Sequence, residues 1–393
     1  MKVYDPKENG TRLSIKCWAS QIEEGALEQA RNLANLPIAQ VHIALMPDAH
    51  QGFGMPIGGV LFTDGAVVPN AVGSDVGCGV AMLKTGLKVE ELDGKLQSVL
   101  DLIASRVPTG FRQHEKPMSS HDAIEAVGAA LPLNVDIGWW DRAIPSLGTL
   151  GGGNHFIEFQ ASTDSNSVYV MLHSGSRGLG KMIGDHYHKM AVTECHRWHT
   201  NLPTDDLAFF PLGTDGHAEY MTAMEFGLAY AKANRNLMLA EVTKAVLQFF
   251  PSAECEVMVN VHHNYAAWEN HKGRNGIVHR KGAIRARVGE ILLIPGSMGT
   301  FSYIGRGLGN PESFDTCQHG AGRAMGRKEA ERQFDAANLA NYMTGHNILM
   351  AGHASEAVDE HPLAYKDIEQ VMADSSTLVE PVTKLYPLGV VKG

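Results

Sequence analysis

The sequence lacks the patterns that identify several common classes of protein. No apolar run approaches the roughly 18 residues of a membrane-spanning helix, and residues 1–10 are polar, without the apolar stretch of a signal peptide. The five cysteines are scattered without CxxC spacing, so neither a disulfide framework nor a zinc ribbon is indicated. We therefore expect a cytoplasmic protein with no membrane association.

Common nucleotide-binding and hydrolase motifs are also absent. The chain contains no GxxxxGK[ST], GxGxxG or GxSxG sequence, which gives P-loop, Rossmann and serine-hydrolase functions little support. Its net charge of −10 argues against a protein that coats nucleic acid non-specifically, because such binding neutralises many phosphates. The charge is uneven, however: residues 272–328 hold ten basic and three acidic residues. This stretch suggests a local site for a polyanion.

The apolar pattern predicts an α+β protein. Helical periodicity is expected in four segments: Glu90–Val107, Glu219–Phe250, Gly326–Met343 and Ala364–Met372. Strands are expected in seven β-branched runs: Val41–Met46, Gly59–Thr63, Val80–Lys84, His155–Phe159, Val168–Leu172, Val257–Val261 and Ile291–Ile294. Without a repeat or linker, residues 1–393 are expected to form one large domain, with surface loops at Pro108–His121, Ala161–Asn166 and Asn201–Gly216.

Polar side chains gather where the expected strands meet glycine- or asparagine-rich turns. Asp75 and Cys78 lie three residues apart in such a turn, and together they offer a carboxylate and a thiolate to one cation. His155, His173 and His263 adjoin similar turns and would complete a metal site. The alternative is a small buried cysteine with histidines that bond to backbone groups.

Two further segments have the chemistry of anion binding. Residues 174–180 resemble an anion nest, since glycines free backbone N–H groups, a helix follows, and Arg177 adds a guanidinium fork. His319 is flanked by Gly320, Gly322 and Arg323, which leaves room for a phosphate beside the imidazole. A histidine that attacks phosphorus and a capping or core histidine are both compatible with this spacing.

Seven motifs together resemble, in order, those of the RtcB family of GTP-dependent RNA ligases. The resemblance runs from about Ala44 to Gly393, and the motifs are Met46-Pro47-Asp48, Asp75-Val76-Gly77-Cys78-Gly79, Gly153-Asn154-His155-Phe156-Ile157-Glu158, His173-Ser174-Gly175-Ser176-Arg177-Gly178, His262-His263-Asn264-Tyr265, Pro295-Gly296-Ser297-Met298-Gly299 and His319-Gly320-Ala321-Gly322-Arg323. Seven ordered motifs are far more specific than any one of them. The resemblance implies an RtcB-like fold of mixed sheets surrounded by helices, with a central metal cleft.

The resemblance also implies roles for individual residues. Two Mn²⁺ ions would be held by Asp75, Cys78, His155, His173 and His263, and His319 would become covalently guanylated. Arg177 and Arg323 would bind phosphate or RNA. The implied GTP contacts are Asn154, His155, Phe156, Ile157, Glu158, His263, Asn264, Pro295, Gly296, Ser297, Met298, Ser302, His319, Gly320, Ala321, Gly322, Tyr365 and Lys392.

The expected function is therefore a ligase that joins a 3′-phosphate or 2′,3′-cyclic phosphate end of RNA to a 5′-hydroxyl end. Its partners would be tRNA or rRNA with broken ends and an archease-like activator. The alternatives are an enzyme that caps 3′-phosphate ends of DNA or RNA with GMP, a two-metal phosphoesterase, and an RNA-binding protein without enzymatic activity.

Two features conflict with simple rules. A regular strand would place His155 and Glu158 on opposite faces, so a shared pocket requires an irregular turn or a bulge. A site rich in cysteine and histidine should by affinity prefer Zn²⁺ over Mn²⁺, so the expectation of Mn²⁺ rests on the resemblance alone.

Overall fold

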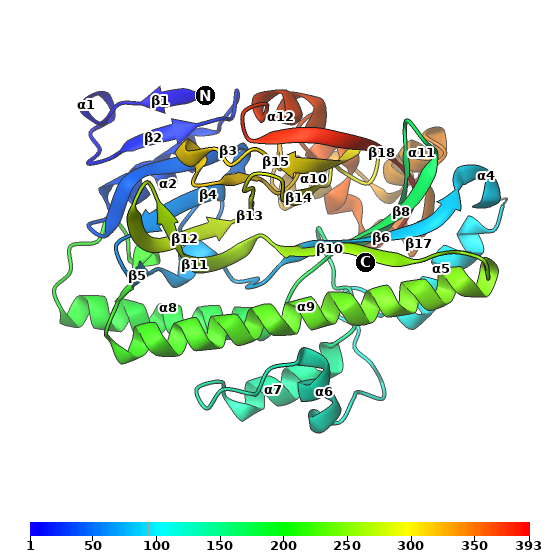
Figure 1. Cartoon of the computed structure of the whole chain (residues 1–393), viewed down its shortest axis with the longest axis horizontal. Helices are drawn as coiled ribbons and strands as arrows, with labels where there is room; N and C mark the ends of the chain where they lie inside the picture. The colour runs from blue at the N-terminus through cyan, green and yellow to red at the C-terminus, as the bar shows by residue number, and fades with distance from the viewer. Residues whose placement is uncertain (93) are drawn as a thin grey trace.

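In the computed structural model, which describes residues 1–92 and 94–393, two large sheets form the framework of the molecule (Figure 1). The six-stranded sheet has, in spatial order, β1 (Lys2–Tyr4), β2 (Ser14–Cys17), β3 (Ala39–His50), β4 (Ile57–Thr63), β12 (Arg274–Lys281) and β11 (Asn264–His271). The main path of the eight-stranded sheet is β10 (Glu256–His262), β6 (Gly79–Lys88), β8 (Ser167–Ser174), β7 (Phe156–Ser162), β18 (Val379–Val391), β15 (Ser302–Gly307) and β14 (Ile291–Ile294).

Both sheets are mixed. In the six-stranded sheet β2 runs parallel to β3, and in the eight-stranded sheet β17 (Leu349–Ala351) runs parallel to β18; the other pairs are antiparallel. Two small ribbons pair β13 (Ala283–Arg285) with β16 (Thr316–Gln318), and β5 (Ala66–Val67) with β9 (Phe210–Pro211). The ribbon of β13 and β16 matters for function because His319 follows directly after it.

Two long helices underlie the sheets. α9 (Asp215–Phe249) runs along most of the molecule, with α8 (Leu179–Arg197) beside its first half, and α6 (Ser120–Val127) and α7 (Ile137–Ala143) lie on the far side of α9 (Figure 1). The remaining helices are α1 (Pro6–Asn9), α2 (Glu24–Asn35), α3 (Pro69–Val72), α4 (Val89–Leu92), α5 (Leu96–Arg106), α10 (Arg327–Gln333), α11 (Ala336–Gly345) and α12 (Ile368–Asp374). No helix in the described ranges is long and apolar enough to cross a membrane.

The expected elements are present, with local differences at their ends. Each of the seven strand-like runs overlaps a strand, and the 219–250 segment lies almost entirely within α9. The 326–343 segment divides into α10 and α11 because Asp335 begins a new helix, where its side chain accepts a hydrogen bond from Asn338 N at 2.7 Å. Similarly, α12 begins only after Asp367, which caps it by accepting from Glu369 N at 3.0 Å.

The expected fold class is confirmed: mixed sheets are surrounded by helices. Of the three expected loops, 108–121 is irregular until α6 begins, 161–166 forms the turn from β7 to β8, and 201–216 holds little regular structure before α9. Residue 93, inside the expected helix of residues 90–107, lies outside the described part of the chain. The assignment of residues 1–393 to one domain stays a prediction.

Candidate functional site

The loop that carries Asp75 and Cys78 is folded tightly against α9. Gly77 has a φ of +77°, and a Cβ there would lie 2.9 Å from the Cβ of Ala231, so only glycine allows the loop to approach the helix this closely. Cys78 N donates to the carbonyl of Asp75 at 3.0 Å. The turn therefore presents both side chains on one side of the loop.

Two buried polar residues of α9 hold this region in place. Arg235 donates from Nη1 to the carbonyls of Gly77 and Ser174, both at 2.9 Å. Asn234 accepts from Gly148 N at 2.7 Å. The helix thus fixes the three loops that bring the metal-ligand candidates together, and the periodic pattern of α9 gave no sign of this role.

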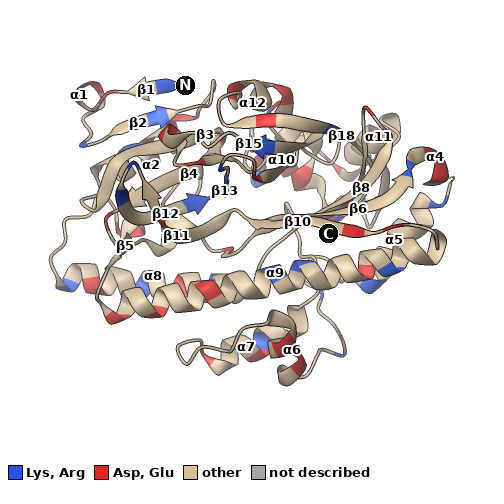
Figure 2. Cartoon of the chain, viewed as in Figure 1, with Lys and Arg blue, Asp and Glu red and all other residues tan. Residues whose placement is uncertain are grey.

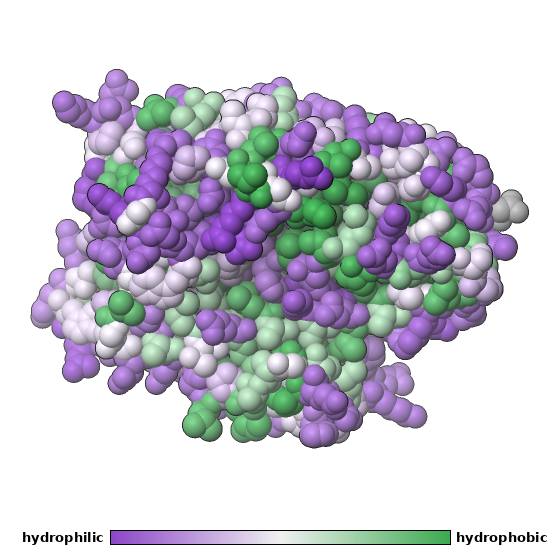
Figure 3. Space-filling model, in the orientation of Figure 1, coloured by the Kyte–Doolittle hydropathy of each residue, from purple (hydrophilic) through white to green (hydrophobic). Residues whose placement is uncertain are grey.

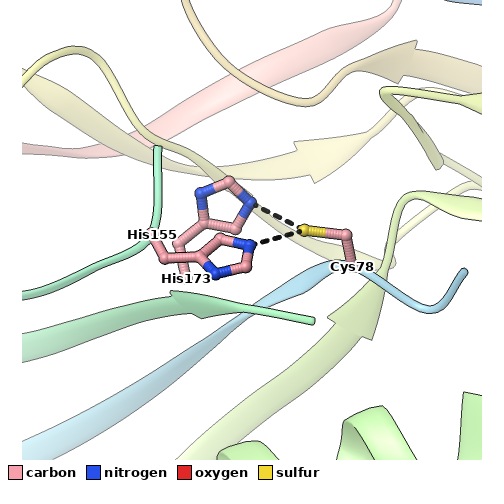
Figure 4. Close-up of side chains that lie close together, drawn as sticks. All are labelled: Cys78, His155 and His173. Atoms are coloured by element: carbon pink, nitrogen blue, oxygen red, sulfur yellow. Dashed lines mark hydrogen bonds between the residues drawn. The ribbon is translucent and has the colours of Figure 1, made fainter. Parts of the chain in front are cut away.

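The sulfur of Cys78 faces two imidazoles that lie on the same side of it (Figure 4). Its distances to His155 Nε2 and His173 Nε2 are 3.5 and 3.3 Å, and all three potential ligand atoms lie within 4.8 Å of one another (Figure 4). The three side chains come from different parts of the chain: Cys78 directly precedes β6, His155 directly precedes β7, and His173 lies near the end of β8, at the same end of the β7–β8 pair. They are all buried.

Asp75 and His263 extend this cluster on opposite sides. Asp75 Oδ2 lies 3.2 Å from His155 Nε2, and His263 Nε2 lies 3.3 Å from His173 Nε2. Cys78 is therefore the shared neighbour of two pairs, Asp75 with His155 and His173 with His263. The structure brings together all five residues that the sequence suggested as metal ligands.

Hydrogen bonds orient the imidazoles for metal binding. The Nδ1 atoms of His155 and His173 each lie 2.9 Å from a backbone carbonyl, of Leu150 and Asn154 respectively. A carbonyl only accepts, so Nδ1 carries a proton in both rings and each Nε2 faces the cluster, where it could bind a metal once it carries no proton. His263 contributes a buried Nδ1 with no hydrogen-bond partner among the described residues. The Nε2 atoms of the three rings converge with the Cys78 sulfur and the Asp75 carboxylate, a set of ligand atoms that fits a bound transition-metal cation.

The protonation of the cluster also suits a cation. Burial, together with neighbouring histidines, lowers the pKa of His173 and of His263 well below the ordinary value, so both rings are neutral. Burial raises the pKa of Asp75, but hydrogen bonding and charge from His155 outweigh it and hold the pKa below the usual range. Burial and Asp75 raise the pKa of the Cys78 thiol, so metal binding must displace its proton.

The conflict between His155 and Glu158 is resolved by the start of β7. The strand begins at Phe156, so His155 belongs to the preceding glycine-rich turn and does not follow strand alternation. Phe156 pairs with His173 and Glu158 with Met171, which places Phe156 and Glu158 on the same face. An irregular turn, the first of the two possibilities, lets both residues serve one site.

His319 is held by the buried carboxylate of Asp48, which belongs to the first of the seven motifs but to which the sequence assigned no role. Asp48 Oδ2 lies 2.8 Å from His319 Nδ1 and accepts the backbone N–H of His319 at 3.2 Å. Asp48 is fully buried. Because its carboxylate accepts, His319 donates from Nδ1, and Nε2 is the ring nitrogen that stays available. The ring centroids of His319 and His263 are 4.7 Å apart, which places the possible nucleophile beside the cluster.

A cavity of about 540 Å³ adjoins His319 and contains most of the expected guanosine contacts. Its walls include Asn154, Phe156, Glu158, Pro295, Gly296, Ser297, Met298, Ser302, Gly320, Ala321, Gly322, Tyr365 and Lys392. Ile157 instead points into the apolar core, and Asn264 bridges two backbone groups, Asp75 O at 3.0 Å and Gly282 N at 2.7 Å. His155 and His263 lie in the metal cluster and outside the cavity wall.

The base of the cavity contains an ion cluster that the sequence reasoning missed. Glu360, 1% exposed, lies 3.1 Å from Arg323 Nη1 and 3.6 Å from Lys392 Nζ, and it also contacts Arg327 and the hydroxyl of Tyr365. Burial raises the pKa of Glu360, but the three cations outweigh it and lower the pKa to about 2. No motif marked Glu360, because its partners are distant in sequence.

The two arginines expected to bind phosphate have protein partners. Arg177 donates to Thr149 Oγ1 at 3.0 Å and to Gly110 O at 2.9 Å, and Arg323 donates to Glu360 and to Asp359 O. The expected anion nest also has an internal ligand, since Ser176 N donates to Asp75 Oδ1 at 3.2 Å. Of the two arginines, Arg323 lines the cavity and Arg177 does not.

The basic stretch at residues 272–328 is largely neutralised within the protein. Arg280 is buried against Glu269, Arg285 lies 2.7 Å from Glu290, and Lys272 pairs with Glu312. Basic and acidic residues accordingly lie close together around β12 and β13 (Figure 2). The sequence count overstated the positive surface because Arg280, Arg323 and Arg327 pair with Glu269, Glu360 and Asp359, which all lie outside the stretch.

Comparisons with known proteins agree with this geometry. The family model described as tRNA-splicing ligase RtcB matches residues 29–140 and 125–393. The chain belongs to the RtcB family. RtcB relatives include the RNA-splicing ligase RtcB of Escherichia coli K12, with 38% identity over 96% of this chain and 97% of the relative. The tRNA-splicing ligase RtcB of Methanococcus maripaludis is 32% identical over 95% of this chain and 92% of its own.

RtcB membership confirms two expectations from the sequence: the family resemblance and the assignment to an enzyme class. The RNA-splicing ligase RtcB of Mycobacterium bovis, 34% identical over 93% of this chain and all of its own, carries the same kind of name. These relatives support an RNA ligase function for the chain. The nucleotide, the metal and the covalent intermediate go beyond what the comparisons show.

Proposed function

We propose that this RtcB protein is a GTP- and Mn²⁺-dependent ligase that joins a 3′-phosphate or 2′,3′-cyclic phosphate end of RNA to a 5′-hydroxyl end. The observation that carries the proposal is the position of His319. Its Nδ1 is tied to buried Asp48, its ring lies beside the metal-ligand cluster, and it lines a cavity large enough for a nucleoside. A nucleophile, a cation site and a base pocket thus meet at one imidazole.

The chain's own residues have distinct tasks in this proposal. Any cyclic phosphate is first hydrolysed to a 3′-phosphate. His319 Nε2 attacks the α-phosphorus of GTP and pyrophosphate leaves, which forms a P–N bond to GMP. The 3′-phosphate of the RNA then takes the GMP, and attack by the 5′-hydroxyl on that RNA phosphate releases GMP. Asp48 accepts the hydrogen bond from His319 Nδ1 throughout. It thereby fixes the tautomer that leaves Nε2 free to attack.

The five clustered residues would hold two Mn²⁺ ions, with Cys78 shared between Asp75 and His155 on one side and His173 and His263 on the other. When bound, the ions neutralise the triphosphate and orient the in-line attack. The choice of tRNA or rRNA, an archease-like activator and a cytoplasmic location rest on the family resemblance.

Labelling with GTP tests the nucleophile. The protein is incubated with Mn²⁺ and GTP labelled at the α-phosphorus and then denatured. Label should remain on the protein, through a bond that acid cleaves more readily than base, and His319→Ala should abolish it. His186→Ala, a change at an exposed histidine of α8, is the matched control and should label normally.

Label on the His319→Ala protein would refute the assignment, and no stable label on wild type would favour the phosphoesterase.

RNA with a 3′-phosphate separates sealing from capping. The ligase produces a joined RNA when a 5′-hydroxyl strand is supplied, whereas a capping enzyme stops at the guanylated 3′ end.

A further inference from the structure

One exposed aromatic residue has no role in the reaction described so far. The side chain of Phe111 is fully exposed, which is unfavourable for an apolar ring without a partner. It lies at the beginning of the irregular segment between α5 and α6. Arg112 and Lys116 follow it and are exposed, and neither is in an ion pair with any described residue.

The backbone that carries Phe111 is held firmly against the metal-ligand loops. Gly110 N donates to Gly151 O at 2.8 Å, Gly110 O accepts from Arg177 at 2.9 Å, and His114 N donates to Pro145 O at 2.9 Å. Hydrogen bonds on both sides of Phe111 therefore fix its position. Because the backbone is already fixed, stacking has to restrict only the rotation of one side chain, which limits the loss of conformational entropy.

The fixed segment lies close to the reactive centre. A Cβ on Gly151 would lie 2.7 Å from His155 Nδ1, so the backbone partner of Gly110 touches a proposed metal ligand. The same segment also lies against the end of the chain, since a Cβ on Gly393 would lie 2.9 Å from Gly110 N. Gly393 directly follows Lys392, which lines the cavity. Phe111 therefore directly follows a residue whose backbone lies close to both the cluster and the chain end beside the cavity.

We propose that Phe111 is a stacking platform for an unpaired base of the RNA strand whose end enters the metal cleft, with Arg112 and Lys116 beside its phosphates. This proposal rests on the proposed RNA ligase function and adds the substrate contact. Unpaired bases stack on exposed aromatic rings with little dependence on sequence, and neighbouring cations bind the backbone. A protein partner would instead require a wider apolar surface, whereas Phe111 is a single exposed ring followed by Arg112 and Gln113.

The part of the chain between α5 and α8 also provides a matched control. Leu133, between α6 and α7, is also fully exposed, and apolar residues are visible at the surface over these helices (Figure 3). The two helices that it connects, α6 and α7, lie beyond α9 from the sheets (Figure 1). A general contribution of exposed apolar side chains to RNA binding would affect Leu133 and Phe111 alike.

The test uses the full chain with Mn²⁺ and a fluorophore-labelled, single-stranded RNA that ends in a 3′-phosphate. Phe111→Ala should weaken RNA binding, measured by fluorescence anisotropy, by about tenfold, the size expected for one lost stacking contact. Guanylation in the absence of RNA should be unchanged. Phe111→Trp should restore binding, and its added tryptophan emission should be quenched by RNA. Leu133→Ala should bind RNA normally, and Leu133→Trp should show no added quenching.

Wild-type RNA affinity in Phe111→Ala, or an equal loss in Leu133→Ala, would overturn the platform. Absence of quenching in Phe111→Trp would also overturn it, because a purely structural role would leave the base away from the ring. These outcomes are separate from the proposed function. If wild type takes no label from GTP, the ligase mechanism fails, whereas RNA affinity and quenching still decide the role of Phe111.

Discussion

Cys78 is the residue on which the contacts of the metal-ligand cluster converge, since its sulfur approaches both His155 and His173. We predict that Cys78→Ser loses bound Mn²⁺ and, with it, guanylation of His319, because a neutral hydroxyl replaces a thiolate ligand. Metal analysis of the purified protein and GTP labelling measure the two effects. Cys255→Ser, at a half-buried cysteine outside the cluster, should retain both. A Cys78→Ser protein with two tightly held ions and full activity would make Cys78 a core residue.

Glu158 is expected to read the guanine base, and its environment predicts a pH dependence. Burial raises its pKa to about 8 in the empty cavity, although Gln160 and Lys392 act in the opposite direction. The ionised form accepts from guanine N1–H and the 2-amino group, so binding must first remove the proton. GTP affinity should therefore rise as the pH increases toward 8 and then level off. Titration calorimetry on His319→Ala, which cannot be guanylated, measures this, and adding Glu158→Gln should flatten the profile.

Nucleotide preference provides a second test of Glu158. Adenine lacks both donors, so above pH 8, where Glu158 is ionised, ATP would leave the buried carboxylate unpaired and cost about 3 kcal/mol, a discrimination of about a hundredfold. Glu158→Ala should lose most guanylation with GTP and gain relatively in its use of ATP. If competition assays show the wild-type preference in this variant, Glu158 does not read the base.

At the scale of elements, α9 supports the site through polar side chains buried in its middle. Arg235 satisfies the carbonyls of Gly77 and Ser174, which precede β6 and end β8. Arg235→Met should leave these two carbonyls without their partner and destabilise the fold by about 2–4 kcal/mol, with weaker Mn²⁺ binding. Urea unfolding with and without Mn²⁺ measures both. Lys232→Met, on the exposed face of the same helix, is the control. An equal effect of this variant would show that the hydrogen bonds of Arg235 do not specifically support the site.

The sequence predicted most of the elements because their apolar spacing is local information. The strands β3, β6, β8 and β10 follow from β-branched runs, and α9 follows from a long helical period. The break between α10 and α11 was missed, since a capping aspartate competes with a continuous period. The His155 turn was also not derivable, because the first residue of a strand depends on its pairing with β8.

At the scale of the whole molecule, Glu360 connects its own segment to two distant parts of the chain: residues 323–327 and Lys392 near its end. Its pKa of about 2 lies below the ordinary value of 4.5, so ionised Glu360 stabilises the fold above pH 4.5 and this contribution is lost as the pH falls toward 2. Glu360→Gln should lower the free energy of unfolding at pH 7 by roughly 3 kcal/mol.

Urea unfolding from pH 7 to pH 3 measures this contribution. The difference between wild type and Glu360→Gln should shrink as the solution becomes more acidic, because protonation makes the two side chains alike. Glu329→Gln changes a carboxylate at the surface of α10 and should have little effect at any pH. A constant difference across this pH range would show that the stabilising effect of Glu360 does not come from its charge.

The sequence by itself determined the chemical inventory of this RtcB protein: the residues able to bind a metal, the histidine in its glycine-rich turn, and the strands and helices that carry them. These follow from motifs and spacing, which involve neighbours along the chain. Only the tertiary structure decided that Asp48 orients His319, that Glu360 gathers three cations, and that much of the basic stretch is internally paired. Each of these depends on residues far apart in sequence, whose contact requires the complete packing of sheets and helices.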